Sequence, residues 1–239
     1  MTIKYDFDWQ MLLEDPYKEW IIEGVTNTVY LSLLAWAIAL TVGIIIGTIR
    51  MTRSPWLRFI GTAYVEFFRN IPLLVQLFVW FFVFPLMLPH DWMLSWNRLP
   101  HIPFITALLA LSLFTAARVA EHIRSGISSI PKGQFDAARS SGLTEVQIYR
   151  YVIIPYAFRV MIPTIASEFL TIFKNSALTL TIGVSEITSS AKAIEAWSFH
   201  GIEAYSVASV TYMTTTAMVV LFMGWLEHRL RIPGLIAKK

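Results

Sequence analysis

Long stretches without a charged side chain divide this chain into apolar segments. Residues 24–49, 70–90, 99–117 and 204–226 contain no Asp, Glu, Lys or Arg. A helix that crosses a bilayer needs about 20 predominantly apolar residues. Buried helices of a soluble core would be interrupted by turn residues far more often than these stretches are. The pattern therefore predicts membrane-spanning helices.

A fifth apolar segment is less clean. Residues 155–173 are apolar except for Arg159 and Glu168, and Lys174 follows them. We predict an all-α integral membrane protein with five transmembrane helices, at about 26–49, 59–89, 100–121, 155–175 and 204–226. The composition agrees, because 15% of the residues are charged and soluble domains have about 25%. An odd number of spans places the two termini on opposite sides of the membrane.

The basic residues predict the orientation of these spans. Segments 50–58, 122–154 and 227–239 lie on one side of the membrane and hold 11 of the 19 Lys and Arg residues. Basic loops are typically cytoplasmic. We therefore expect residues 1–25 to be extracytoplasmic, and loop 122–154 and tail 231–239 to be cytoplasmic. Acidic residues precede the first span, which favours an uncleaved anchor over a signal peptide. The excess of basic residues thus follows from topology and implies no nucleic-acid partner.

The sequence offers little catalytic or cofactor chemistry. No Lys is followed by Ser or Thr, so the chain lacks a P-loop for ATP. It also lacks an H-E-x-x-H metal motif, a G-x-S-x-G nucleophile motif and any cysteine. We therefore expect a chain that is not an enzyme and that binds no cofactor or metal.

The predicted cytoplasmic loop contains the amphipathic stretch "DAARSSGLTEVQIYRYVIIP", from Asp136 to Pro155. Gly142 suits the end of a short helix. Thr144 with Gln147 three residues later matches a capping box that starts a second helix. Pro155 either ends that helix or opens the next span. The pair could pack on its own membrane domain, or it could lie in a groove of a soluble partner.

Six residues of this loop carry a family resemblance. Asp136, Ala137, Ala138, Gly142, Ile153 and Pro155 resemble the EAA motif of ATP-binding-cassette (ABC) importer permeases. Asp136 replaces the usual Glu, and Ile154 stands where Leu is usual. "YVEFFRNIPLLVQLF" and "FKNSALTLTIGVSEIT" resemble segments of permeases for polar amino acids. "LFTAARV" and "KNSA" are most similar to glutamate/aspartate importer permeases.

The resemblance implies an architecture and a set of partners. It implies the type I ABC importer permease fold, with the six loop residues as a cytoplasmic coupling helix pair that contacts an ATPase. The ATPase dimer would bind ATP and Mg²⁺ on a separate subunit, and an extracytoplasmic solute-binding protein would deliver the amino acid. A second permease subunit, either another copy or a related chain, would complete the pathway. Asp136 could also simply stabilise a helix N-terminus, where a carboxylate gains about 0.3–1 kcal/mol.

Polar residues in or near the spans are candidates for the substrate pathway. Charged side chains are costly inside a membrane and usually have a partner or a function. Arg69 and Lys174 are the cations that we expect to meet an acidic substrate. Glu66 and Arg69 could instead pair along one helix, and Lys174 could mark the outer end of a span. The full set of pathway candidates is Glu66, Arg69, Asn70, Glu168, Lys174, Asn175 and Ser176.

Two backbone features accompany these candidates. Pro72 removes a backbone donor and should break or kink the second span. Gly43 and Gly47 form a G-x-x-x-G pattern that permits close helix approach and could serve an interface between subunits.

Two other classes of protein would also explain the spans. A secondary transporter would show two related halves, and no self-similarity is visible. A membrane scaffold would leave the EAA spacing unexplained.

Overall fold

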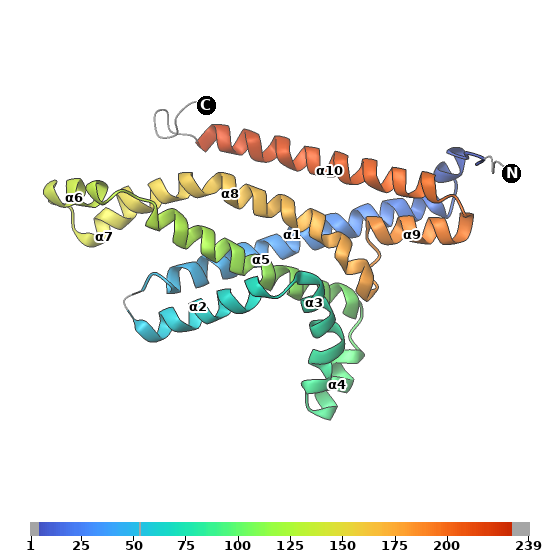
Figure 1. Ribbon diagram of the computed structural model, residues 1–239, viewed down its shortest axis with the longest axis horizontal. Coiled ribbons are helices and arrows are strands. Elements are labelled where there is room, and N and C mark those ends of the chain that lie inside the picture. Colours follow the sequence, from blue (N-terminus) through green and yellow to red (C-terminus); the bar gives the residue numbers. More distant parts are fainter. Residues whose placement is uncertain (1–4, 53, 231–239) are drawn as a thin grey trace. The chain divides into compact units, whose positions relative to one another are not determined.

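The computed structural model describes residues 5–52 and 54–230, apart from the side chains of residues 226, 227 and 230. Helices joined by short turns make up this part of the chain, and no strand occurs in it (Figure 1). The predicted tail 231–239 lies outside the described residues. The chain divides into two compact units, and several long helices have one part in each unit.

Four helices are long and apolar enough to cross a membrane. They are α1 (Tyr17–Ile49), α5 (Ile102–Ser128), the continuous helix Glu145–Ile182 that contains α8 (Ile154–Asn175), and the Gly201–Trp225 part of α10 (Gly201–Leu230). The broken pair α2 (Pro55–Asn70) and α3 (Leu73–Phe78) adds a fifth candidate. The break lies at Pro72, which precedes α3 as its N-cap. The predicted interruption at Pro72 is therefore confirmed.

Unit 1 comprises residues up to Ala37, Ile71–Ser112 and Thr171–Met218. Besides parts of α1, α5, α8 and α10, it contains α3, α4 (His90–Asn97) and α9 (Ile187–Ser198). Shorter helical turns complete it: η1 (Gln10–Leu13), the π-helix η2 (Val79–Val83) and the 3₁₀-helices η3 (Phe84–Met87) and η5 (Ser176–Ile182). Its core joins η1, α9 and α10 through buried apolar side chains such as Leu12, Ile194 and Ala204.

A buried carboxylate fixes the start of α9. The Glu186 side chain accepts hydrogen bonds from the backbone N–H groups of Thr188 at 2.9 Å and Ser189 at 2.7 Å, and from the Tyr212 hydroxyl at 2.5 Å. Gly24 lets α1 approach closely, because a Cβ there would lie 2.4 Å from the Ser190 hydroxyl oxygen. Helix α9 is thus tied to both α1 and α10 inside unit 1.

Unit 2 comprises Ile38–Asn70, Leu113–Leu170 and the chain from Val219 onwards. It contains α2, α6 (Lys132–Ser140), α7 (Glu145–Ile148) and the π-helix η4 (Tyr149–Ile153), with parts of α1, α5, α8 and α10. Its helices pack closely at glycines: a Cβ on Gly43 would lie 2.6 Å from Val119, and one on Gly47 would lie 3.0 Å from Ile123. The G-x-x-x-G pattern therefore brings α1 against α5 of the same chain.

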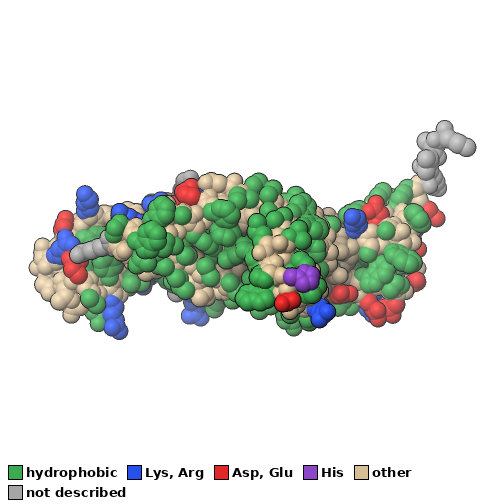
Figure 2. Space-filling model, turned by 90° about the horizontal axis from the view of Figure 1, so that it is seen from below, with side chains coloured by type: hydrophobic (Ala, Val, Ile, Leu, Met, Phe, Trp, Pro, Cys, Tyr) green, Lys and Arg blue, Asp and Glu red, His purple; other side chains and the backbone are tan. Residues whose placement is uncertain are grey.

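Figure 2 shows hydrophobic side chains gathered over the middle of the face that it displays, with charged side chains mainly toward its two ends. This surface fits the expected lipid environment. Large apolar side chains on α1, such as Tyr30, Leu33 and Leu34, are also exposed. An apolar exterior is costly in water but favourable in hydrocarbon.

Candidate functional site

The last turns of α5 carry a group of ionisable side chains in unit 2. Arg118, Glu121, His122 and Arg124 follow an alanine-rich run that favours a helix. Residues three and four apart on a helix are neighbours. This group includes side chains that the sequence analysis did not select, although charges at the end of an apolar span could have pointed to them.

Glu168 on α8 is held by two of these side chains. The Arg118 guanidinium donates from Nε to Oε2 at 2.6 Å and from Nη2 to Oε1 at 2.9 Å, and His122 Nε2 lies 2.9 Å from Oε1. The carboxylate side chain is 5% exposed, whereas that of Arg118 is 41% exposed. Glu168 is therefore a buried carboxylate that holds the half-exposed guanidinium of Arg118 in place.

Glu121 lies beside three arginines, one from the turn after α1, one from α2 and one from α5 itself. Its Oε2 lies 2.6 Å from Arg50 Nη1 and 3.5 Å from Arg69 Nη1, and its Oε1 accepts from Arg124 Nη2. Arg50 is buried and passes beside Gly61, where a Cβ would lie 2.7 Å from Arg50 Cγ. One carboxylate thus faces three guanidinium groups, which leaves a local excess of positive charge.

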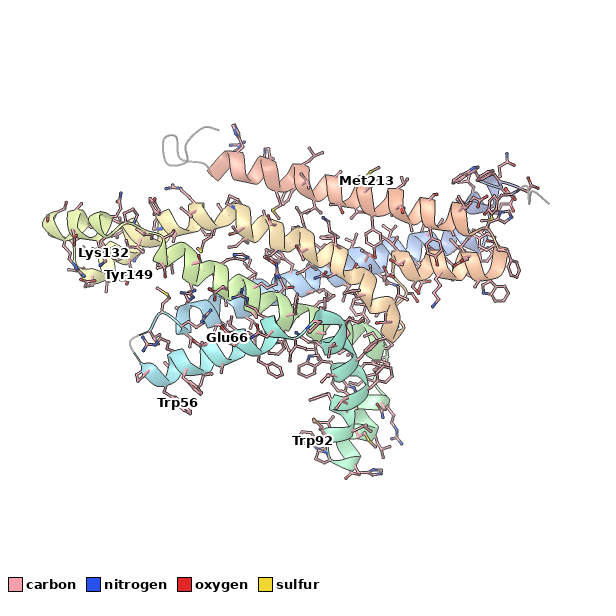
Figure 3. All side chains as sticks on the ribbon, viewed as in Figure 1. Trp56, Glu66, Trp92, Lys132, Tyr149 and Met213 are labelled. Carbon is pink, nitrogen blue, oxygen red and sulfur yellow. The ribbon has the colours of Figure 1, made fainter. Side chains whose placement is uncertain are left out.

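The alternative in which Glu66 pairs with Arg69 along one helix does not form among the described residues. Arg69 lies beside Glu121, while Glu66 accepts a hydrogen bond from Asn70 Nδ2 at 3.2 Å. Glu66 lies on α2, the helix that begins beside Trp56, and both labelled side chains can be followed in Figure 3. Of the predicted pathway residues, the structure therefore joins Glu66 with Asn70 and gives Arg69 another partner.

The remaining pathway candidates belong to unit 1. Lys174 is exposed on the last turn of α8, and Asn175 ends that helix. Ser176 is fully buried and donates its hydroxyl to the carbonyl of Phe173 at 2.8 Å. In this structure the Ser176 hydroxyl proton is therefore directed to its own helix. The 3₁₀-helix η5 follows directly.

The amphipathic loop forms the two expected helices. Helix α6 leaves Asp136 and Ala137 exposed and buries Ala138. Gly142 follows in the left-handed conformation, with φ of 78°. Thr144 and Gln147 form the predicted capping box at the start of α7. Figure 3 shows Lys132 at the beginning of α6 and Tyr149 just after α7.

The second helix is not a separate short element. Helix α7 continues through η4 into α8, so Pro155 lies in the first turn of α8. A proline inside a continuous helix cannot donate a backbone hydrogen bond, and the π-helix η4 ends just before it. The Arg139 guanidinium lies 2.8 Å from the Glu145 carboxylate and links α6 to α7. Ile148 and Ile153 are buried, whereas Val146 is 76% exposed.

Comparison with known proteins identifies this arrangement. A family model described as "Binding-protein-dependent transport system inner membrane component" matches residues 39–232. The chain belongs to this family of ABC transporter permeases. It is a multi-pass protein of the inner membrane and not an enzyme, because ATPase activity in such transporters sits on a separate subunit.

Two curated relatives cover most of the permease. The "Glutamate/aspartate import permease protein GltJ" of Escherichia coli K12 is 39% identical over 239 residues, which is 96% of this chain and 97% of the relative. The "Probable glutamine ABC transporter permease protein GlnM" of Bacillus subtilis 168 is 33% identical, over 87% of this chain and 92% of the relative. The permease is therefore similar to transporters of more than one amino acid.

Solved structures give the fold of the permease. A structure titled "Crystal structure of an amino acid ABC transporter with histidines" matches with a TM-score of 0.81 and 29% identity, over 94% of this chain and 100% of that chain. The methionine ABC transporter MetNI in an inward-facing conformation matches with a TM-score of 0.70 at 18% identity, over 92% of this chain and 100% of that chain. The permease thus has the all-helical type I ABC importer fold.

Proposed function

We propose that this permease forms half of the translocation pathway of an ATP-driven importer of acidic amino acids. The other half would be a second permease subunit, a cytoplasmic ATPase dimer would supply the energy, and an extracytoplasmic binding protein would deliver the substrate. Five spans with an extracytoplasmic N-terminus and a cytoplasmic α6–α7 pair belong to this proposal.

The proposal of ATPase coupling rests on the continuous helix from Glu145 into α8. A force on α7 passes through η4 into a membrane-spanning helix without crossing a flexible loop. The motif residues Asp136, Ala137, Ala138, Gly142, Ile153 and Pro155 are the coupling set. Ala138 and Ile153 are buried and hold the pair in place, whereas Asp136 and Ala137 are exposed and available to the ATPase.

The charge of unit 2 supports an acidic substrate. Arg50, Arg69, Arg118 and Arg124 face two carboxylates, Glu121 and Glu168. Arg69, Arg118 and Arg124 are each partly exposed. A substrate carboxylate would gain from this excess positive charge in a membrane, where the dielectric constant is low. The similarity to GltJ, named as a glutamate/aspartate permease, points the same way.

A pull-down with the ATPase tests the coupling role. Asp136→Lys reverses a charge on the exposed face of α6 and should weaken ATPase binding at least tenfold, the loss expected when a charge pair becomes a repulsion. Gln134→Ala, at an exposed position of the same helix, serves as the matched control and should bind normally. Normal binding by Asp136→Lys would remove this residue from the coupling set.

Uptake by proteoliposomes tests the substrate class. Unlabelled aspartate should compete with labelled glutamate, and equimolar glutamine or arginine should compete at least tenfold less effectively. Equal competition by glutamine would show that the importer does not select acidic amino acids over neutral polar ones. A membrane scaffold or a secondary transporter would show no ATP-dependent uptake at all.

A further inference from the structure

A groove with a volume of about 650 Å³ lies within unit 1, and no residue of the charged cluster on α5 or of α6 and α7 lines it. It is bounded by α1, by the start of α5 with the turn before it, and by the turn after η5. Binding sites for small molecules have volumes of about 300–1,000 Å³. The groove is therefore large enough for a ligand and has no role in the proposed transport mechanism.

One face of α1 forms a wall that changes from polar to apolar. Glu23, Asn27, Tyr30 and Leu34 all line the groove and follow one another at helical spacing. They extend over about 16 Å at a rise of 1.5 Å per residue. The lining residues at the start of α5 change in the same way along the chain, from His101 to Phe104 and Ile105. This order matches the boundary between headgroups and hydrocarbon in a bilayer.

The polar end of the groove carries one acidic side chain, Glu23, together with His101. Glu23 lines it, and no Lys or Arg does. Among the described residues no hydrogen bond or ion pair involves the Glu23 carboxylate. Asn27 is occupied, since its Nδ2 donates to the carbonyl of Ser185 at 2.7 Å. The charge of this end therefore favours a cationic group.

We propose that the groove binds a phospholipid with a primary-ammonium headgroup, of the ethanolamine class. The ammonium pairs with Glu23, the phosphate accepts hydrogen bonds from Tyr30 and His101, and an acyl chain lies along Leu34 and Phe104. A free amino acid also carries an ammonium group, but it would leave the apolar half of the groove empty. Hydrocarbon fills that half and removes exposed apolar surface.

Lipid retention in the assembled importer tests this site. The importer is reconstituted in nanodiscs with equal amounts of phosphatidylethanolamine, phosphatidylcholine and phosphatidylglycerol, and the lipids that remain bound are identified by native mass spectrometry. We expect phosphatidylethanolamine to be retained about fivefold over each of the others, as for one partly exposed ion pair. Equal retention of the three lipids would overturn the proposal.

Three variants separate the two ends of the groove. Glu23→Gln should abolish the preference for ethanolamine, and Leu34→Trp should reduce retention of every lipid by filling the apolar end. Glu19→Gln, on the exposed first turn of α1 and outside the groove, is the matched control and should behave as wild type. A thermal unfolding curve for each variant confirms folding. An unchanged preference in a folded Glu23→Gln importer would contradict the assignment.

Two further measurements test whether something other than a lipid occupies the groove. Millimolar glutamate should not displace the lipid; displacement would make the groove a substrate site and overturn the proposal. The importer should retain the lipid as well as the isolated permease does. Loss of lipid on assembly would show that another subunit covers the groove. That result would also overturn the lipid proposal. Neither arm measures transport, so the proposed function can fail or succeed independently.

Discussion

Two buried glutamates show how differently this permease uses carboxylates. Glu168 in unit 2 is held by Arg118 and His122, whereas Glu186 in unit 1 is held by two backbone N–H groups and the Tyr212 hydroxyl. Both side chains are almost completely buried. Glu168 therefore positions a charged, half-exposed neighbour, while Glu186 caps a helix with neutral donors.

We expect this difference to separate a functional arrangement from a structural one. A buried ion pair is weak evidence for stability, because desolvation offsets much of its Coulomb attraction. A carboxylate that receives N–H donors at a helix start has a clear local purpose. We therefore expect changes at Glu168 to affect transport and changes at Glu186 to affect folding.

The largest effect should come from removing one partner of the Glu168 pair. Arg118→Met leaves the buried carboxylate without its arginine and should lower the free energy of unfolding by about 2 kcal/mol, less than for a fully buried pair because Arg118 is half-exposed. Glutamate-stimulated ATPase activity should fall at least tenfold. Denaturant titration and ATPase assays measure the two effects, and wild-type behaviour in both would show that the pair is dispensable.

Removing both partners should separate stability from activity. The double variant Arg118→Met with Glu168→Met should regain stability to within about 1 kcal/mol of wild type, because apolar replacements of buried ion pairs are often neutral. Its glutamate-stimulated activity should remain low. If activity returned with stability, the ion pair would be structural and the contrast with Glu186 would disappear.

The Glu186 variant should show the opposite behaviour. Glu186→Gln keeps an oxygen for the α9 N–H groups and should cost about 1 kcal/mol of stability, as other N-cap changes do. Transport by the folded importer should stay within about twofold of wild type, since no cation is lost. A tenfold loss of transport at unchanged stability would give Glu186 a direct role.

The pH dependence of stability provides a further check on Glu186. Burial raises the pKa of the Glu186 carboxyl above its ordinary value of 4.5. The folded chain then binds more protons at this site than the unfolded chain, so stability falls as the pH rises from the ordinary pKa through the raised one. Thermal unfolding between pH 4 and pH 7 should show this loss in wild type and less of it in Glu186→Gln. An identical profile in both proteins would exclude Glu186 as its source.

The smallest effects should come from two left-handed glycines, one in each unit. Gly142 has φ of 78° and Gly183 has φ of 88°, and a Cβ at either position would meet no heavy atom closer than 3.9 Å. Alanine at each should therefore cost only the backbone strain of about 1 kcal/mol. Gly142→Ala should also weaken ATPase binding in a pull-down, whereas Gly183→Ala should not. Equal binding would mean that the α6–α7 turn tolerates either backbone.

Local features of the fold could be predicted from the sequence because their causes are local. Uncharged stretches indicated the spans, Pro72 indicated the break, and Thr144 with Gln147 indicated the capping box. The fate of Pro155 was left open, because a proline suits both the end of one helix and the start of the next.

The candidate site was harder to predict because its contacts are distant in sequence. Arg118 lies 50 residues from Glu168, and Arg50 lies 71 residues from Glu121. Helical spacing suggested that Arg69 could pair with Glu66. In the structure, α2 packs against α5, and Arg69 lies beside Glu121 instead. The sequence also allowed the glycines of α1, Gly43 and Gly47, to serve an interface between subunits. In the structure they pack against α5 of the same chain.

The most direct test of the central claim is ATP hydrolysis by the reconstituted importer with its binding protein. The account predicts that glutamate or aspartate stimulates hydrolysis at least tenfold more than glutamine or arginine, and that Asp136→Lys abolishes the stimulation while Gln134→Ala preserves it. Hydrolysis that did not respond to acidic amino acids, or that responded equally with lysine at position 136, would contradict it.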